Sequence, residues 1–454
     1  MDSSFLVYTL PNAADGEGGS HILLHPERSN WVRVNDTGLK IARALDAGAS
    51  EEDVAAHLAT SYRISEERAR GDVSYVSGEL GKACFFTRTG LKTSLKRPLK
   101  SLFFHLTERC NLACRHCYVS CPEHAGKRAK DLETAAVLRC IEELAEQGGR
   151  SVTLSGGEPL LHPELKKILI RCAPQVSVNL LTNGTLIDRE WADFLADLEV
   201  GVHVQISVDG SRAEIHDAQR GKGSFDRALR AVDHLQRAGL GEKLNFCTTL
   251  MTQNLHDLKA IIHLTERLKV PLVRFLPLRH KGSAREAWDS IGSGIDVKDH
   301  EAFYRETAEL EDSGACAVEV SCGLSGFILA IPEDAADDDL WCPIGKKLVV
   351  SATGDTYPCV LMMKDEYKLG NIYHDSLAAL HDSRAMARLC ITLINRRRKI
   401  ERCSSCSWRN LCQAGCMGLA LEQKGTVWDT DVFCDYRREA YEKAFARVLG
   451  LTSK

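Results

Sequence analysis

Between residues 101 and 280, strand-like and helix-like segments alternate, and this alternation limits the folds open to the chain. The strand-like segments are short and apolar, and they cover residues 102–106, 152–154, 176–181, 202–208, 244–250 and 272–276. The segments between them carry apolar residues at helical spacing, over residues 131–147, 163–172, 188–198, 225–238 and 255–268. Such alternation is typical of a parallel sheet that is either doubly wound or curled into a barrel. We therefore predict an α/β core of six βα units.

Three cysteines follow the first of these strands. Cys110, Cys114 and Cys117 lie within one short loop, and in a barrel the loops after the strands form the rim that carries the chemistry. A structural zinc site needs four ligands, whereas three thiolates on a four-iron, four-sulfur cluster leave one iron open. Cys121 is close, but its spacing makes it a weak fourth ligand. The loop therefore predicts a metal centre with an open position.

The composition indicates a reducing compartment, in which clustered thiols bind metal rather than form disulfides. The chain has 454 residues, 18 cysteines and a net charge of −4. No apolar stretch approaches the ~20 residues that span a bilayer, and the N-terminus lacks the basic segment of a signal peptide. We expect a soluble cytoplasmic protein with no membrane and no nucleic-acid partner. The basic run at 396–399 is interpreted as a solvated helix face, and isolated cysteines such as Cys247 as small buried residues.

The spacing C-x3-C-x2-C after the first strand of a βα barrel resembles the signature of the radical S-adenosylmethionine (SAM) enzymes. In that family the three cysteines hold a [4Fe-4S] cluster whose open iron binds SAM. One electron cleaves SAM, and the resulting 5′-deoxyadenosyl radical removes hydrogen from an unactivated carbon. His116 lies where many relatives carry an aromatic residue beside the adenine, and an imidazole can stack there. The resemblance implies a partial (β/α)6 radical SAM barrel.

Further residues at the predicted rim match SAM contacts of that family. Gly156, Gly157 and Glu158 follow the second strand, as in the family's GGE motif, whose backbone and carboxylate hold the SAM amino group. Ser207 ends the fourth strand, where family members place a serine on the ribose. Arg220 resembles the arginine that pairs with the SAM carboxylate, and an exposed loop arginine is the alternative interpretation. The resemblance thus implies a complete SAM site.

A second group of cysteines resembles the seven-cysteine pattern of the SPASM domain, a C-terminal extension of radical SAM maturases. By resemblance, one auxiliary [4Fe-4S] cluster is held by Cys403, Cys406, Cys412 and Cys434, and another by Cys342, Cys359 and Cys416. For the latter, Cys322 is a candidate fourth ligand, Cys316 a poorer one, and an open iron the alternative. A zinc ribbon also suits thiolates, but the open three-cysteine loop favours iron–sulfur clusters. A turn at Gly354 predicts a β-hairpin, and the rest of this part reads as loop-rich.

The first 92 residues predict a winged-helix-like unit. Strand candidates at 21–25 and 31–34 precede three helical patterns, which begin near residues 36, 50 and 65. The arrangement resembles the PqqD-like element that binds the leader of a precursor peptide by adding a strand to its sheet. A winged helix that packs on the barrel or binds DNA is the alternative, but the third helix is not strongly basic.

These resemblances divide the chain into a leader-recognition domain over residues 1–92, a radical SAM core over 93–300 and a SPASM domain over 301–454. They imply an oxidoreductase that modifies a ribosomally synthesised precursor peptide and takes electrons from a flavodoxin or ferredoxin. A thioether is the first expected product, followed by carbon–carbon or carbon–oxygen crosslinks, and epimerisation is also open. The rivals are a radical SAM enzyme of another kind, such as a sulfatase maturase or a tetrapyrrole enzyme, and a zinc-binding adaptor. No residue is assigned as a general base.

Overall fold

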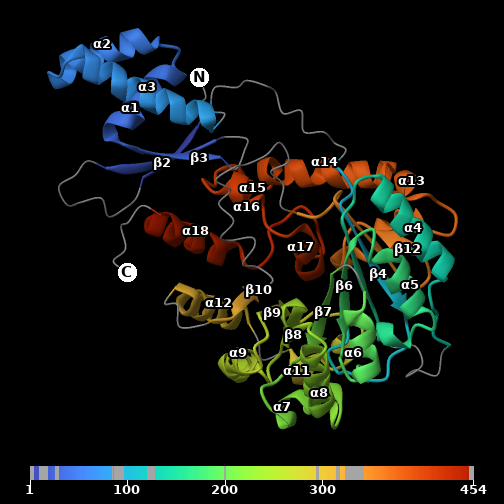
Figure 1. The fold of residues 1–454 in the computed structure, drawn as a ribbon. Coiled ribbons are helices and arrows are strands. Elements are labelled where there is room, and N and C mark those ends of the chain that lie inside the picture. Colours follow the sequence, from blue (N-terminus) through green and yellow to red (C-terminus); the bar gives the residue numbers. More distant parts are fainter. Residues whose placement is uncertain are drawn as a thin grey trace.

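The computed structural model describes residues 5–9, 19–25, 30–83, 85, 97–119, 128–198, 201–292, 296–312, 317–322 and 342–448. Within these ranges the strands form two sheets, one of three strands near the N-terminus and one of ten strands. Figure 1 shows the three-stranded sheet with its helices at one end of the molecule and the larger sheet at the other. The C-terminal helix α18 (Cys434–Val448) lies below the smaller sheet in that view.

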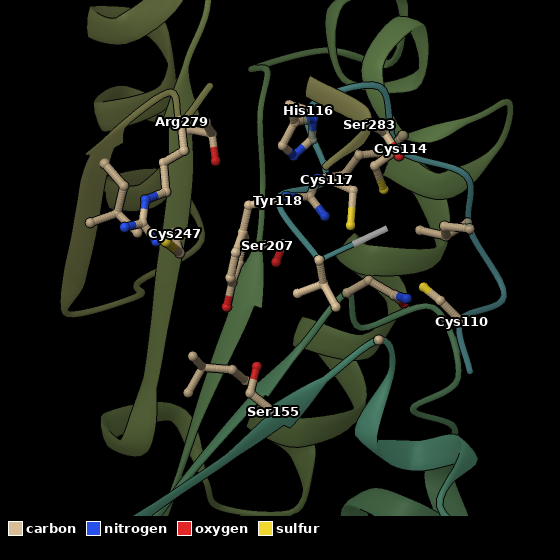
Figure 2. A pocket seen from close by; sticks show the side chains of 18 of the residues that line it. Cys110, Cys114, His116, Cys117, Tyr118, Ser155, Ser207, Cys247, Arg279 and Ser283 are labelled. Carbon is tan, nitrogen blue, oxygen red and sulfur yellow. The ribbon is translucent and has the colours of Figure 1, made fainter. Parts of the chain in front are cut away.

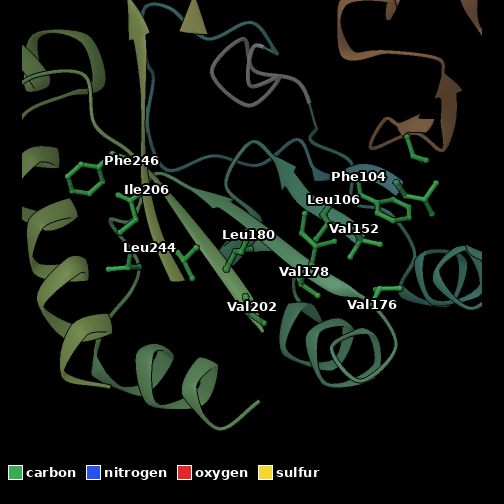
Figure 3. Close-up of a cluster of buried hydrophobic side chains, with 14 of the residues drawn as sticks. Phe104, Leu106, Val152, Val176, Val178, Leu180, Val202, Ile206, Leu244 and Phe246 are labelled. Atoms are coloured by element: carbon green, nitrogen blue, oxygen red, sulfur yellow. The ribbon is translucent and has the colours of Figure 1, made fainter. Parts of the chain in front are cut away.

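Six parallel strands form the centre of the larger sheet, as the sequence predicts. They are β4 (Ser101–Thr107), β5 (Ser151–Gly156), β6 (Ser177–Thr182), β7 (Val202–Ser207), β8 (Leu244–Leu250) and β9 (Leu272–Pro277). Each pairs in parallel with the next strand in the sequence. Alternate residues such as Phe104, Val178 and Ile206 are fully buried on the helix-facing side (Figure 3). This alternation positions the other side chains, and the loops after the strands, for a site at one end of the sheet.

The predicted helices between these strands are confirmed, and one further helix is present. The predicted ones are α4 (Thr134–Glu146), α5 (Leu165–Cys172), α6 (Arg189–Ala196), α8 (Ser224–Arg237) and α9 (Leu258–Arg267). The unpredicted one is α7 (Ala213–Arg220), whose last residue is Arg220. Because Arg220 is only 9% exposed, its interpretation as an exposed loop arginine is wrong.

The sheet continues into the C-terminal third of the chain. β10 (Glu319–Cys322) pairs in parallel with β9, and β11 (Lys347–Val350) pairs in parallel with β4. β11 and β12 (Asp355–Tyr357) form the predicted hairpin, and Gly354 in its turn has the left-handed φ of +82° that favours glycine. β12 also pairs with the two-residue strand β13 (Gly370–Asn371). The pairing of β11 with β4 brings this part of the chain against the first strand of the barrel.

The prediction that the rest of this part is loop-rich is wrong. The described residues contain α12 (Val297–Asp312), α13 (Leu377–His381), α14 (Arg384–Lys399), α15 (Glu401–Ser404), α16 (Arg409–Cys412), α17 (Met417–Lys424) and α18. Leu377, Met386 and Met417 are buried in the same apolar cluster as the barrel strands. Much of the tail is therefore held by apolar burial on the barrel as well as by whatever its cysteines bind.

The basic run at 396–399 is a solvated helix face only at Arg398 and Lys399, because the other two arginines are buried. Arg396 is 0% exposed and Arg397 is 4% exposed. The guanidinium of Arg396 donates to four backbone carbonyls, those of Ala414, Gly415, Val427 and Asp429. Arg396 therefore fixes the loops on either side of α17. A local charge pattern does not reveal these carbonyl acceptors, because they are distant in the sequence.

The N-terminal unit contains the predicted hairpin and three helices, together with one strand that was not predicted. Its elements are β1 (Leu6–Thr9), β2 (Ser20–Leu24), β3 (Trp31–Asn35), α1 (Asp36–Asp46), α2 (Glu51–Tyr62) and α3 (Glu66–Lys82), with β2 in the middle of an antiparallel sheet. Asn35 caps α1 by accepting from the Gly38 amide, and Ser50 caps α2 by accepting from the Asp53 amide. Leu23 packs toward the helices of this unit, whereas its neighbours Ile22 and Leu24 pack against α16 and α18 and the Trp408 ring. No helix among the described residues has the length and apolarity needed to cross a bilayer.

Candidate active site

A cavity of about 650 Å³ lies where the six parallel strands end. Every strand from β4 to β9 contributes to its lining, and so does the loop that follows β4. Figure 2 shows the cysteines of that loop on one side of the cavity and Arg279 with Cys247 on the other, with Ser207 between them. The position agrees with the expectation that the chemistry is found at the strand ends.

The three cysteines of the loop all line the cavity. Burial raises the pKa of Cys110 to about 12 and that of Cys114 to about 11, and the neighbouring cysteines add to both effects. Among the described residues, no group of three or more His, Cys, Asp or Glu side chains converges as the ligands of one metal ion do. A [4Fe-4S] cluster binds each thiolate on a different iron, so its ligands stay farther apart than those of a single ion. Three thiols around one cavity therefore fit a cluster, which displaces their protons on binding.

The Gly156–Glu158 segment is tied to the cysteine loop by its backbone. The Gly157 amide donates to the Thr107 carbonyl at 2.7 Å, and the Glu158 amide donates to the Arg109 carbonyl at 2.7 Å. A Cβ on Gly157 would lie 2.1 Å from the Arg109 oxygen, and one on Gly156 would lie 2.4 Å from the Thr107 oxygen. The two glycines, which line the cavity, are thus required for close approach to the loop itself.

The carboxylate of Glu158 is turned into the protein. It is 0% exposed and accepts from the Thr182 hydroxyl at 2.7 Å, the Asn183 amide at 2.8 Å and the Leu160 amide at 3.2 Å. Burial raises its pKa to about 7, and these hydrogen bonds limit the rise. Asn183 in turn donates to the side chain of Asn111 in the cysteine loop at 3.0 Å. Glu158 therefore joins the ends of β5 and β6 to the cysteine loop.

Asp209, which the sequence did not single out as a site residue, connects three elements around the cavity. It follows β7 and is 0% exposed. Its carboxylate accepts from Arg220 Nε at 2.5 Å and from the Thr249 amide at 2.8 Å, and His116 Nε2 lies 3.2 Å from it. Burial acts to raise the pKa of Asp209, but the charge of Arg220, the two nearby histidines and the Thr249 amide lower it overall. The carboxylate is therefore ionised and holds Arg220 beside the cysteine loop.

Arg220 and His116 keep atoms available for a ligand. Arg220 lines the cavity, and no hydrogen bond with the described residues uses its two terminal nitrogens. Burial lowers the pKa of His116 to about 4, so the ring is neutral, and its Nε2 lies 3.2 Å from the Asp209 carboxylate. Its Nδ1 atom is buried without a partner among the described residues. A carboxylate for Arg220 and a hydrogen-bond donor for His116 are what SAM can supply, so these residues fit the cofactor.

Ser207 lines the cavity from the end of β7, as predicted, and three residues that the sequence did not assign join it. Cys247 on β8, interpreted above as a buried structural residue, lines the cavity although it is only 8% exposed. Tyr118, directly after Cys117, also lines it, and its ring lies 5.5 Å from the Arg279 guanidinium. Their positions at strand ends or beside the cysteine loop are the sequence signal that could have identified them.

The seven C-terminal cysteines fall into two groups in the structure. Burial raises the pKa of Cys403 to about 12, and Cys412, Cys434 and Cys406 raise it further. Burial also raises the pKa of Cys416, with further contributions from Cys359 and Cys342. The cysteines that interact electrostatically are members of the two sets named above, and which of them hold which cluster stays a prediction. Cys322 ends β10, but its side chain lies outside the described part of the chain, as do Cys121 and Cys316.

Two buried arginines hold this cysteine-rich part together. Arg396 fixes the loops that flank α17, as described above. Arg437 is 0% exposed and donates from Nη2 to Asp431 at 2.6 Å, and Asp431 also accepts from the Cys416 amide at 2.6 Å. Arg437 interacts electrostatically with Cys412, so a positive charge lies beside thiols that ionise when they bind metal.

Three family models match the chain. Residues 104–265 match the radical SAM superfamily, residues 20–85 match coenzyme PQQ synthesis protein D (PqqD), and residues 342–407 match the SPASM iron–sulfur cluster-binding domain. The three matches lie on the parallel strands, the N-terminal unit and the cysteine-rich part, respectively.

Curated relatives cover most of the chain. The mycofactocin maturase MftC of Mycolicibacterium smegmatis is 32% identical over 70% of this chain and 77% of its own length. The Fe-coproporphyrin III synthase of Methanosarcina barkeri is 28% identical over 76% of this chain and 89% of its own length. The crystal structure of Streptococcus suis SuiB bound to precursor peptide SuiA covers 92% of this chain and 96% of its own, with a TM-score of 0.62 and 15% identity. This last likeness is one of fold.

Proposed function

Because this chain belongs to the radical SAM family and carries PqqD-like and SPASM parts, we propose that it modifies a ribosomally synthesised precursor peptide. It is an enzyme whose cofactors are SAM, a SAM-binding iron–sulfur cluster and the auxiliary clusters of the SPASM domain. The observation that carries the proposal is that one chain contains both an N-terminal sheet with an edge strand and a cavity lined by the residues expected to bind SAM. We place the three parts at 1–92, 93–300 and 301–454.

The residues of the cavity have separate roles in this proposal. Cys110, Cys114 and Cys117 would hold the cluster, which would supply the electron that cleaves SAM. The terminal nitrogens of Arg220 would hold the SAM carboxylate, and Asp209 keeps the guanidinium in place through Nε. The backbone of Gly156 and Gly157 would hold the SAM amino group, with Ser207 at the ribose and His116 at the adenine. Glu158 contributes by fixing this backbone, because its carboxylate already accepts three hydrogen bonds.

The auxiliary clusters occupy the two cysteine groups of the C-terminal part. Cys359 directly precedes Val360, which lines the cavity, so one cluster site adjoins the reaction space. A cluster there could accept the second electron of an oxidative crosslink or bind a peptide thiolate. Because thiolate binding leads to a thioether, we place thioether formation first and carbon–carbon or carbon–oxygen crosslinks second. We further propose a flavodoxin or ferredoxin as the electron donor and a cytoplasmic location, where the thiols stay reduced.

The leader of the precursor peptide binds at the free edge of β3. Among the described residues, β3 pairs only with β2. The His25 amide donates to the Asn30 carbonyl at 2.9 Å. Since hydrogen-bonded and non-hydrogen-bonded pairs alternate along an antiparallel ladder, the Arg33 amide points away from β2. An added strand can therefore bond to this edge, and α3, which contacts β3, can supply apolar contacts.

A proline at position 33 tests this placement. Arg33→Pro removes the outward amide while sparing the bonds to β2, and Arg33→Ala is the matched control. We expect the proline variant to bind a peptide encoded by a neighbouring gene at least about tenfold more weakly and both variants to cleave SAM normally without peptide. Equal peptide affinity in the two variants would contradict the placement.

The reaction itself is tested anaerobically with the full chain, SAM and that peptide, by mass spectrometry. A loss of two hydrogens indicates a crosslink, and unchanged mass with deuterium uptake from solvent indicates epimerisation. An unmodified peptide alongside formation of Fe-coproporphyrin III from a tetrapyrrole precursor would instead assign the chain to the tetrapyrrole function of one of its relatives. A colourless protein with zinc and little iron would support the adaptor.

A further inference from the structure

Positive charge exceeds negative charge around the cavity. Of the described residues that line it, four are arginines, Arg115, Arg220, Arg274 and Arg279, and one is a carboxylate, Glu286. Arg220 is neutralised by Asp209, and Arg115 donates to the Ser290 hydroxyl at 2.5 Å. Arg115 belongs to the cysteine loop, whereas Arg274 and Arg279 lie on β9 and in the segment after it, apart from the residues assigned to SAM.

Arg274 is exposed to the cavity from β9. It has no hydrogen bond or ion pair with the described residues, although its charge reaches Cys247 on β8 and Lys347 on β11. Lys347 is itself half-buried, and among the described residues no carboxylate is paired with it. The two cations repel each other, and an anionic ligand beside Arg274 would relieve this repulsion.

Arg279 continues the positive surface at the start of the segment after β9. Its side chain is 15% exposed, its guanidinium lies over the Tyr118 ring, and it forms a long ion pair of 3.7 Å with Glu422, which leaves its donors free for a closer hydrogen-bonded partner. Lys281 lies two residues further on, and its pKa is lowered by burial and by the charge of Arg279. Arg274 and Arg279 therefore line one wall of the cavity, and Figure 2 shows Arg279 across the cavity from the cysteine loop.

We propose that Arg274 and Arg279 bind a carboxylate of the substrate. The proposal rests on the function given above and names its substrate class, a peptide whose modified segment presents either an acidic side chain or the C-terminal carboxylate to this wall. In an unmodified ribosomal peptide, carboxylates are the groups that are anionic at neutral pH. The planar guanidinium fork matches a carboxylate and fixes its orientation, so the bound carboxylate would set which carbon faces SAM.

Arg279 and Lys347 also lie near Cys359. Their charges lower the pKa of the Cys359 thiol, which burial raises overall. If they served only to balance an auxiliary cluster, their removal would reduce iron loading and leave carboxylate binding unchanged. The two roles are therefore separable by measuring both quantities in the same variant.

The test uses the full, anaerobically reconstituted chain with SAM and three short probes. N-acetyl-Gly-Glu-Gly-amide carries only a side-chain carboxylate, N-acetyl-Gly-Gly-Gly only a C-terminal one, and N-acetyl-Gly-Gln-Gly-amide neither. Saturation-transfer NMR gives their affinities. We expect one of the charged probes to bind at least about tenfold more tightly than the neutral one, and Arg274→Gln to remove that difference. Which charged probe binds identifies the source of the carboxylate.

Arg285→Gln is the matched control, because Arg285 is exposed on α10 (Ser283–Glu286) and does not line the cavity. The proposal is overturned if the three probes bind alike to the wild-type chain, a comparison that needs no variant. It is also overturned if Arg274→Gln and Arg279→Gln keep the preference for a charged probe, whether or not these variants lose iron. Charge-dependent binding without any peptide modification would leave this site standing and count against the proposed function alone.

Discussion

Replacing Asp209 with Asn is expected to lower the free energy of unfolding by about 3–5 kcal/mol, because it leaves the charge of Arg220 buried without a partner. Asp209 is fully buried, the Arg220 side chain is 10% exposed, and Nε lies 2.5 Å from Oδ2. Arg220→Gln should cost a similar amount, since it leaves the carboxylate unpaired. Removing both charges together should cost less than the sum of the single changes, by about 1–3 kcal/mol.

Urea unfolding of the full chain, followed by circular dichroism before iron is added, measures these four free energies. SAM affinity after reconstitution provides a second reading, in which Asp209→Asn weakens binding although Asp209 itself contacts Arg220 and not the ligand. The reasoning fails if the costs of the two single variants simply add in the double variant. It also fails if Asp209→Asn leaves both stability and SAM affinity unchanged.

Three further predictions concern the cysteine loop, the C-terminal part and pH. Gly157→Ala should sharply reduce iron uptake by the SAM-binding loop, since its methyl group would lie 2.1 Å from a carbonyl oxygen of that loop, whereas Gly78→Ala, which meets open space, should leave iron per chain unchanged. Arg396→Met should destabilise the C-terminal part by about 3–5 kcal/mol, because four backbone carbonyls, two of them fully buried, lose a charged donor. Hydrogen exchange should rise around α17 but not in the exposed control Arg388→Met. The pKa of Glu158 is raised from 4.5 to about 7, so its contribution to stability is full below pH 4.5 and lost as the pH rises through 7. The stability of the wild type relative to Glu158→Gln should therefore fall between about pH 5 and pH 8. A difference that stays constant over this range would contradict the burial of this carboxylate.

The parts of the fold that the sequence predicts are those set by local pattern. Buried parallel strands need continuous apolar residues, and their covering helices need one apolar face, so the six βα units were visible. The cysteine loop was visible for a similar reason, because its three thiols are neighbours in sequence. The structure adds that the nearby glycines serve the approach of two loops to each other as well as the lining of the cavity.

What the sequence did not reveal depends on partners that are distant along the chain. Asp209 is defined as a site residue by Arg220, His116 and Thr249, which lie on three different segments. Arg396 was misread as a surface residue because its acceptors lie 18 to 33 residues further on. A charged residue in a helix is usually solvated, and only the tertiary structure identifies the exceptions.

The N-terminal sheet is held in place because it packs against helices of the C-terminal part of the chain. Ile22 is fully buried against the ring of Trp408, which stacks on Phe445 with ring centroids 5.0 Å apart, and Asn410 donates to the His25 carbonyl at 2.6 Å. A peptide strand held at the edge of that sheet would therefore start at a set distance from the cavity. The number of residues between its anchored and reacting positions would then determine which residue is modified, so lengthening that spacer would shift the modification to a different position in the peptide.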